Sequence, residues 1–369
     1  MSGTCDAAAE QVTRRLGFDC HHVSPIVSFH NPFALASWTM PILELLIVAG
    51  AIFAFVHARR RLRAGDPTGI AIWFASLVYL LVTEPPLYFP EWFGLEKQFG
   101  FIFAHNVFTV QFMYGRLPLY IVAIYPALSQ LAYELVRVLG VFRRGALVGS
   151  IAVAFVCQVF YEIFDQLGPQ LKWWAWNGAN LKVNHPALAS VPMTSMLLFA
   201  SVSFGALTYL VVRLTGSRDA AGAPRHGWSL TGRIVLAGVL TPLAMGVAGI
   251  PSGLFGGDHP HLHVQAWIIG VELGLVWLGG GWVLITQLRR RVGTESMTPF
   301  ARMYPAVYLA VLAVLWLSAL PAYLDAEHGL TTSGTPIGSG PYVIACFAAA
   351  AALLAMLYRT RRDAQARTG

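Results

Sequence analysis

Five acidic side chains lie inside or at the edge of strongly apolar segments of this sequence. They are Glu44, Glu84, Glu162, Asp165 and Glu272. A charged residue at the centre of a membrane span costs roughly 2.5–3.5 kcal/mol, so a functional role is the first hypothesis for each of them. A carboxyl group that leaves water for an apolar site keeps its proton near neutral pH, and it can then act as a general acid.

An acid of this kind could protonate an isolated alkene. The tertiary cation that forms is stabilised by aromatic faces and by a second carboxylate. Water captures it in a hydration, and another alkene captures it in a ring closure. Isoprenoid lipids carry such alkenes within the bilayer, and Tyr161, Trp174 and Trp176 stand near two of the acids in the sequence.

The composition is that of a polytopic membrane protein. The 369 residues are 56% hydrophobic and 12% charged, with a mean hydropathy of +0.59, whereas soluble domains carry about 25% charged residues. The net charge of +7 arises from short clusters of basic residues between apolar runs. This pattern orients membrane spans, so it does not indicate a nucleic-acid partner.

Apolar runs of about 20 residues, the length that crosses a bilayer, recur along the chain. They predict an all-α fold, a polytopic bundle of eight to nine transmembrane helices. The nine runs cover residues 38–58, 68–89, 117–139, 145–167, 191–213, 231–251, 264–287, 303–323 and 341–358.

Basic clusters follow every second run and set the expected orientation. By the positive-inside rule they face the cytoplasm, so we expect the N-terminus outside and the C-terminus inside a bacterial-type cell membrane. The clusters, which include Arg218, Arg225 and Arg291, lie at residues 59–63, 143–144, 213–233, 289–291 and 359–362.

This topology divides the chain into five parts. An extracytoplasmic arm (1–37), expected to be poorly ordered and without the pattern of a cleaved signal, precedes the first membrane half (38–213). A cytoplasmic loop (214–230) leads to the second membrane half (231–358). A cytoplasmic tail (359–369) follows.

Two of the outward connections are unusual. Residues 99–114 are apolar but too short to cross, so we expect a re-entrant or interfacial segment. His105 and Asn106 within it could line the same cavity as the acids or cap an interfacial helix. Residues 168–190 carry the tryptophans typical of a headgroup boundary.

The acids are predicted to lie at one depth. With a rise of about 1.5 Å per residue, Glu44 lies roughly 9 Å from the outer end of its run, Glu84 and Glu162 roughly 8 Å, and Glu272 roughly 12 Å. Asp165 is closer to the surface, so all five fall in the outer third of a core about 30 Å thick. Glu162 and Asp165 are three residues apart and should share a helix face and meet as a pair.

Simpler interpretations apply to some of these residues. Asp165 and Glu272 are close enough to the surface to hydrogen-bond to water or to pair with a base. Glu134 lies near the cytoplasmic end of the third run with Arg137 one turn later, and we interpret it as an ion pair outside the site.

The sequence predicts no metal site and no cofactor. The segment His259-Pro260-His261-Leu262-His263 has the composition of a metal cluster, but its proline argues against a helix that would present the histidines together. The proposed acid chemistry needs no cofactor. Among the four cysteines, only Cys5 and Cys20 share a segment and could form a disulfide.

Short motifs in residues 38–213 carry a family resemblance. They are Pro41-Ile42-Leu43-Glu44 followed by His57-Ala58-Arg59-Arg60-Arg61, Thr83-Glu84, Tyr161-Glu162-Ile163-Phe164-Asp165 followed by Trp174-Ala175-Trp176, and Val191-Pro192. In these motifs the chain resembles the membrane carotenoid 1,2-hydratases and related carotenoid-biosynthesis proteins, including bisanhydrobacterioruberin hydratase. It departs from their pattern at Gln166, where the family's second acid is expected, and at Thr194-Ser195, which replaces an asparagine.

The resemblance implies acid-catalysed hydration of a terminal alkene in a carotenoid or another polyisoprenoid. Glu84 or Glu162 would donate the proton, and Asp165 or Glu44 would position water or receive the proton. Apart from the resemblance, the residues themselves suggest a substrate-binding set. It comprises Tyr161, Trp174 and Trp176 as aromatic lining, with His105, Asn106 and, by its depth alone, Glu272.

Three other functions stay open. They are a terpene cyclase that uses the same acid, a transporter, and a structural membrane protein. The inner halves of the runs are nearly all Leu, Val, Ala and Ile, which favours an enzyme or a structural role over conduction. The expected partners are the lipid substrate and the surrounding membrane lipids.

Overall fold

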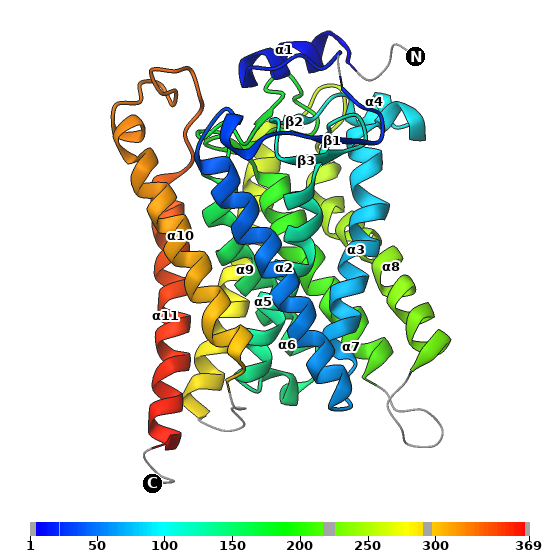
Figure 1. The fold of residues 1–369 in the computed structure, drawn as a ribbon, viewed down its shortest axis with the longest axis vertical. Helices are drawn as coiled ribbons and strands as arrows, with labels where there is room; N and C mark the ends of the chain where they lie inside the picture. Colours follow the sequence, from blue (N-terminus) through cyan, green and yellow to red (C-terminus); the bar gives the residue numbers. More distant parts are fainter. Residues whose placement is uncertain (1–4, 22, 217–225, 291–296, 366–369) are drawn as a thin grey trace.

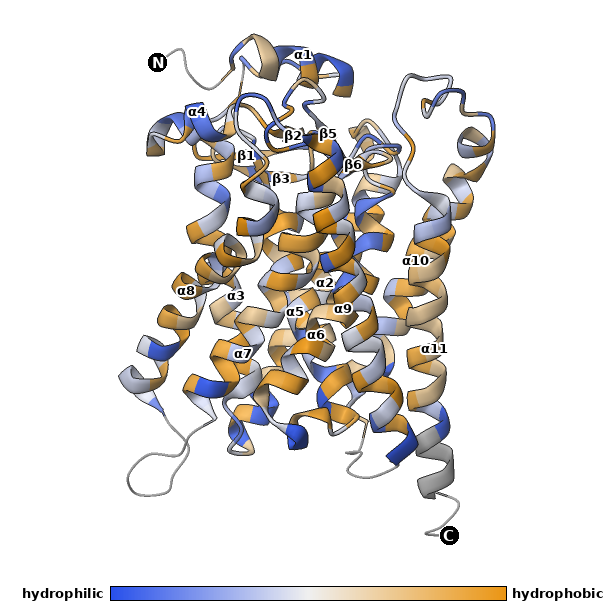
Figure 2. Cartoon of the chain, turned by 180° about the vertical axis from the view of Figure 1, so that it is seen from behind, coloured by the Kyte–Doolittle hydropathy of each residue, from blue (hydrophilic) through white to orange (hydrophobic). Residues whose placement is uncertain are grey.

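Long apolar helices dominate the computed structural model, which describes residues 5–21, 23–216, 226–290 and 297–365, the last six by backbone alone. Within these residues nine helices are long and apolar enough to cross a membrane. They run along the long axis of the molecule (Figure 1), and hydrophobic residues cover much of their length (Figure 2). The spans are α2 (Thr39–Arg63), α3 (Thr68–Tyr88), α5 (Leu119–Val138), α6 (Ala146–Asp165), η4 with α7 (Ser195–Ser203 and Phe204–Thr215), α8 (Gly227–Gly253), α9 (Leu262–Arg290), α10 (Pro299–Leu324) and α11 (Gly340–Gln365).

The predicted all-α bundle is confirmed, and each predicted run coincides with one observed span. The fifth run differs most at its start, because Val191 and Pro192 form strand β7, which pairs with β6 (Ala187–Leu188). The helix starts only at Ser195 and makes π-helical turns up to Ser203. The predicted residues Arg218, Arg225 and Arg291 lie outside the described residues.

Two spans form the centre of the bundle. In α5, 89% of the most apolar window is buried, and in α6 the share is 72%. The corresponding shares in α8 to α11 lie between 22% and 33%. Side chains that point inward from α5 and α6 are therefore shielded from lipid by the other helices, and these two spans can position buried polar groups.

The N-terminal end of the bundle carries a cap of short strands. Strand β1 (Val27–Phe29) pairs antiparallel with β3 (Val110–Phe112), and β3 pairs with β4 (Leu117–Pro118). Strand β2 pairs antiparallel with β5, which sets His105 opposite Trp174. The segment 99–114, predicted to be re-entrant or interfacial, lies in this cap and contains the strands β2 and β3. The remaining elements are η1 (Pro32–Ala34), η2 (Pro90–Phe93), α4 (Glu96–Phe99), β2 (Phe103–His105), η3 (Val141–Arg144) and β5 (Trp174–Trp176).

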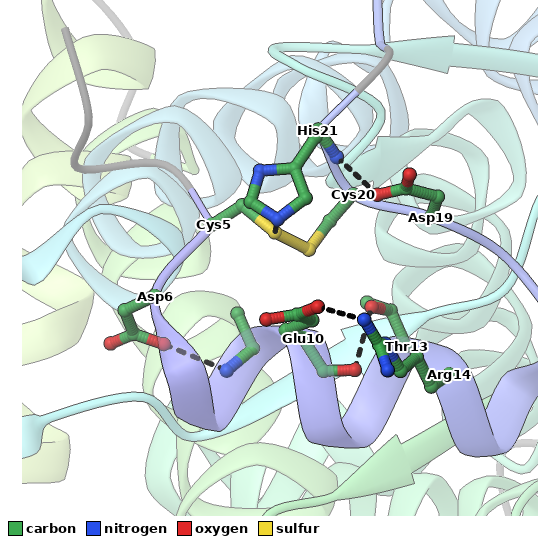
Figure 3. The surroundings of a disulfide bond; sticks show 9 residues. Cys5, Asp6, Glu10, Thr13, Arg14, Asp19, Cys20 and His21 are labelled. Atoms are coloured by element: carbon green, nitrogen blue, oxygen red, sulfur yellow. Dashed lines mark hydrogen bonds and ion pairs between the residues drawn. A yellow bond between two sulfur atoms is a disulfide. The ribbon is translucent and has the colours of Figure 1, made fainter.

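The expected poor order of the N-terminal arm is wrong for its described part. Residues 7–16 form helix α1 (Ala7–Leu16), whose Val12 and Leu16 are buried against the cap. A disulfide joins Cys5 to Cys20 across this helix (Figure 3). The cross-link and the buried apolar face fix the arm, and these contacts depend on partners far away in the sequence.

The inner half of the bundle is less apolar than the sequence indicated. Near the end opposite the cap, the Glu134 carboxylate lies 2.8 Å from Arg137 Nη2 and 3.1 Å from His57 Nε2. The predicted pair of Glu134 and Arg137 is confirmed, but it is buried and includes His57 from α2. The inner half of the bundle thus carries a buried charged cluster of the kind that a conduction path can also use.

Helix α1 lies at one end of the bundle, and the last turns of α11 lie at the other (Figure 1). An odd number of crossings requires this arrangement. The basic residues Arg143 and Arg144 lie at the end away from the cap, which the positive-inside rule assigns to the cytoplasm. We call the capped end the outer end on this basis.

Candidate functional site

A cavity of about 360 Å³ lies beneath the cap, between the outer ends of α3, α5, α6, η4 and α8. Six of the ten predicted site residues line it: Glu84, His105, Tyr161, Asp165, Trp174 and Trp176. Most of the other lining side chains are apolar. The cavity therefore joins two carboxyl groups from different helices within one aromatic and aliphatic enclosure.

Glu84 enters the cavity from the last turns of α3. Its side chain is buried, and the phenol of Tyr125 on α5 donates a hydrogen bond to its Oε1. Tyr88 also hydrogen-bonds to the Glu84 side chain. Because Tyr88 is four residues after Glu84, the two lie on one face of α3. Two phenols thus hold the carboxyl group at the cavity wall.

Asp165 is the last residue of α6, and its side chain lines the cavity. Its side chain is buried, and its Oδ2 has no hydrogen-bond partner in the protein. Ser195, the first residue of η4, hydrogen-bonds to the same side chain. Asp165 therefore keeps one buried carboxyl oxygen free of protein hydrogen bonds next to the cavity.

Aromatic rings form much of the remaining wall. The rings of Phe164 and Trp174 have centroids 4.9 Å apart, and those of Phe103 and Trp176 are 5.2 Å apart. The predicted lining by Tyr161, Trp174 and Trp176 agrees with this arrangement. Such π faces stabilise positive charge at short range.

His105 closes the top of the cavity from the cap. Its Nε2 lies 3.0 Å from the Tyr88 hydroxyl, and its Nδ1 lies 2.9 Å from the Tyr120 hydroxyl. Burial lowers the pKa of His105 to about 3, so the ring is neutral near pH 7. A neutral imidazole has one donor and one acceptor nitrogen, so it donates to one phenol and accepts from the other.

Glu44 and Asn106 lie outside the cavity and hold the cap together. The Glu44 carboxylate accepts a hydrogen bond from the Thr109 amide at 3.1 Å. The Asn106 side chain donates to the backbone oxygens of Leu16, at 3.3 Å, and Lys172, at 2.8 Å. Both predicted site residues thus join α2, α1 and the loop after α6 to the strands.

Glu162 and Glu272 also lie outside the cavity. Glu162 is fully buried and its Oε2 accepts from the Gln166 amide at 3.1 Å, whereas Asp165 faces the cavity. The two carboxyl groups interact electrostatically, as their spacing on one helix face predicts, but only Asp165 lines the cavity. Glu272 is half-buried on α9, away from the cavity lining.

Among the polar residues that were not predicted, four interact with the carboxyl groups or with His105: Tyr88, Tyr120, Tyr125 and Ser195. Only Tyr88 had a signal in the sequence, since its spacing from Glu84 places both on one helix face. The other three come from different segments, and their approach depends on how the helices rotate and pack.

The histidine segment of the α8–α9 connection shows no sign of a metal centre. Among the described residues, no group of three or more His, Cys, Asp or Glu side chains has the geometry to hold a metal ion. Asp258, directly before this segment, forms an ion pair in which Lys182 Nζ lies 2.5 Å from its Oδ1. That ion pair joins the connection to the outer cap.

Comparison with models of protein families, with curated proteins and with solved structures finds no match to this chain. The similarity to carotenoid hydratases therefore rests on the short motifs alone. Three of the acids in those motifs, Glu44, Glu84 and Asp165, lie at the outer end of the bundle, and two of these line the cavity.

Proposed function

We propose that this integral membrane protein is an enzyme that adds water to a terminal alkene of a carotenoid or another polyisoprenoid by acid catalysis. The observation that carries the proposal is the presence of Glu84 and Asp165 in one aromatic-lined cavity at the outer end of the bundle. Protonation followed by water attack requires one carboxyl group that donates a proton and a second that accepts one. Glu84 and Asp165 have different partners and could take these two roles.

The site would work as follows. Protonated Glu84 gives its proton to the CH carbon of the terminal double bond. The π bond breaks, and the other carbon of that bond becomes a tertiary cation. The faces of Tyr161, Trp174 and Trp176 stabilise that charge. A water molecule held by Asp165 attacks the cation, a C–O bond forms, and Asp165 takes the proton that the water loses. The product is a tertiary alcohol.

The cavity offers a lateral entrance for a lipid substrate. Its lining includes Val82 of α3, which is 37% exposed, and the half-buried Leu198 and Phe199 of η4. These residues lie on the outer surface of the bundle, where lipid tails surround the protein. An isoprenoid chain can therefore enter from the bilayer with its terminal group leading, while the rest of the chain stays in lipid.

The test uses purified protein in lipid nanodiscs with lycopene, a polyene with two terminal isopropylidene groups, in water enriched in heavy oxygen. Mass spectrometry of the lipid extract should detect a labelled tertiary alcohol. An unlabelled isomer of unchanged mass would indicate a cyclase instead. Absence of both products, with lycopene and with polyprenoid lipid extracts, would contradict the enzymatic proposal.

Substitutions identify the acids. We expect Glu84→Gln and Asp165→Asn to lower product formation by roughly 10²- to 10⁴-fold, the range for loss of a general acid or base. Glu96→Gln, at an exposed acid of the cap, is the matched control and should keep wild-type activity. Glu162→Gln tests the other predicted donor, and we expect a far smaller loss because Glu162 lies outside the cavity.

A further inference from the structure

A row of neighbouring polar groups leads from Glu84 across the top of the cavity. Tyr88 interacts with the Glu84 side chain from the same face of α3, its hydroxyl lies 3.0 Å from His105 Nε2, and His105 Nδ1 lies 2.9 Å from the Tyr120 hydroxyl. All three residues of this row are buried. At its far end, Tyr120 lies within electrostatic range of Asp165 and Glu44 as well as Glu84.

We propose that Tyr120, His105 and Tyr88 form a proton-return path from Asp165 to Glu84. This inference rests on the proposed function, because hydration leaves Glu84 without its proton and Asp165 with one. The buried Oδ2 of Asp165, which lacks a protein partner, is the atom that would carry the proton to be returned. Tyr120 is not part of the cavity lining, so a water molecule bound between Asp165 and Tyr120 would complete the path.

The protons balance in this path. After one turnover each donor points toward Glu84: Asp165 through water to Tyr120, Tyr120 to Nδ1 of His105, Nε2–H to Tyr88, and Tyr88 to the Glu84 carboxylate. Each proton moves along its own hydrogen bond by one step. Glu84 becomes protonated, Asp165 becomes ionised, and the two phenols and the imidazole stay neutral. No proton is gained or lost overall.

The path must then be reset, because the imidazole proton has moved from Nε2 to Nδ1. His105 and Tyr88 also line a second cavity of about 30 Å³ beneath α1, together with Thr13 and Arg116. This volume exceeds the roughly 10–15 Å³ that one water molecule needs. The return to the starting tautomer needs one proton to leave Nδ1 through Tyr120 and another to reach Nε2 through Tyr88, which lines this second cavity. The ring need not turn, and its neighbours Phe103 and Trp174 pack against it.

Turnover kinetics separate a return path from a merely structural role. Tyr120→Phe removes the hydroxyl at the far end of the path and leaves Glu84 and its partner Tyr125 in place. Since Glu84 starts protonated, we expect the first turnover of lycopene to proceed within about twofold of wild type and later turnovers to slow by roughly 10²-fold. The expected signature is a burst of one labelled product per protein molecule, followed by slow later turnovers. His105→Asn should give the same burst.

The control is Tyr133→Phe, a buried tyrosine at the other end of α5, where we expect no burst and wild-type turnover. Equal first and later turnovers in Tyr120→Phe and His105→Asn would overturn the return path. A slow first turnover in both would also overturn it, because a positioning role would then explain the loss. Failure of the wild-type protein to form product would instead contradict the proposed function.

Nuclear magnetic resonance of the imidazole provides a readout that needs no substrate. In protein with ¹⁵N-labelled histidine, the His105 signals are assigned by their loss in His105→Asn. We expect one protonated and one unprotonated ring nitrogen at neutral pH, and a changed tautomer ratio in both Tyr88→Phe and Tyr120→Phe. A doubly protonated ring, or signals unchanged in both variants, would contradict the path.

Discussion

At the residue scale, the contacts of a carboxyl group decide its role more than its depth does. Glu84 and Asp165 lie in the cavity, whereas Glu44 accepts a bond from the cap backbone and Glu162 from Gln166. All four are buried to a similar extent. Depth could be predicted from the sequence because it follows from a count of residues. The direction of each side chain could not, because it depends on helix rotation and on partners from other segments.

The hydrogen bond from Tyr125 to Glu84 gives a prediction at this scale. We expect Tyr125→Phe to lower the free energy of unfolding by about 1–3 kcal/mol, the cost of a lost partner for a buried polar group. In a Glu84→Met background the same substitution should cost almost nothing. A double-mutant cycle, measured by unfolding in mixed micelles, checks this.

The cycle isolates the pair because Tyr125 and Glu84 come from different helices. A coupling free energy near zero would show that the bond seen here contributes nothing to stability. Values of about 0.5–3 kcal/mol are usual for residues in direct contact.

At the element scale, the membrane helices and the cap differ in how far the sequence predicts them. The spans follow from local apolar runs, so their positions could be predicted within a few residues. The cap depends on pairs such as Val27 with Phe112 and His105 with Trp174, which are distant in the chain. Its strands have three residues or fewer, too few for an alternating pattern to show. The sequence predicted that residues 99–114 are re-entrant or interfacial, but it did not predict the strands that they form.

The start of α3 carries a pH-dependent contact. Burial tends to raise the pKa of Asp66, but hydrogen bonds from Arg61 and from the Thr68 amide outweigh this effect and lower the pKa below its usual value of 3.8. A lowered pKa in the folded state stabilises the protein above the unfolded pKa, and this stability is lost as the pH falls through the folded value.

We therefore expect the thermal unfolding midpoint of the wild-type protein to fall more steeply below about pH 4 than that of Asp66→Asn. Unfolding in detergent between neutral and acidic pH measures the difference. The exposed-acid variant Glu96→Gln serves as control and should follow the wild type. Parallel curves for wild type and Asp66→Asn would contradict the assignment.

The disulfide of α1 gives a second prediction for an element. Cys5 and Cys20 close a loop with a sequence separation of 15, and loss of such a cross-link costs about 3 kcal/mol in the chain-entropy account. In the double variant Cys5→Ser/Cys20→Ser we expect faster amide exchange in α1 and in the paired strands, and unchanged exchange in α5 and α6. Hydrogen exchange with mass spectrometry measures both; slower or unchanged exchange in α1 would contradict the prediction.

At the scale of the whole molecule, orientation is the property that basic residues predict and that labelling can test. Glu96 is exposed in the cap and Arg143 is exposed at the opposite end. We expect an impermeant maleimide to label Glu96→Cys in intact cells and Arg143→Cys only after permeabilisation. The native cysteines interfere little, since Cys157 and Cys346 are buried and the other two form the disulfide.

The opposite labelling pattern would reverse the topology. It would also place the disulfide in a reducing compartment, where such bonds rarely persist. The outward orientation of the cap thus has two independent supports, the positions of the basic residues and the cysteine pair.

The buried ion cluster at the inner end also bears on how the protein is made. Helix α5 has the lowest mean hydropathy of the described spans, 1.4, and it carries both Glu134 and Arg137. Its charges find their third partner, His57, on α2, which is synthesised earlier. Insertion of α5 into the bilayer is therefore a cooperative step that depends on α2 being already in the membrane, and the central helix of the finished bundle is the one least able to enter it alone.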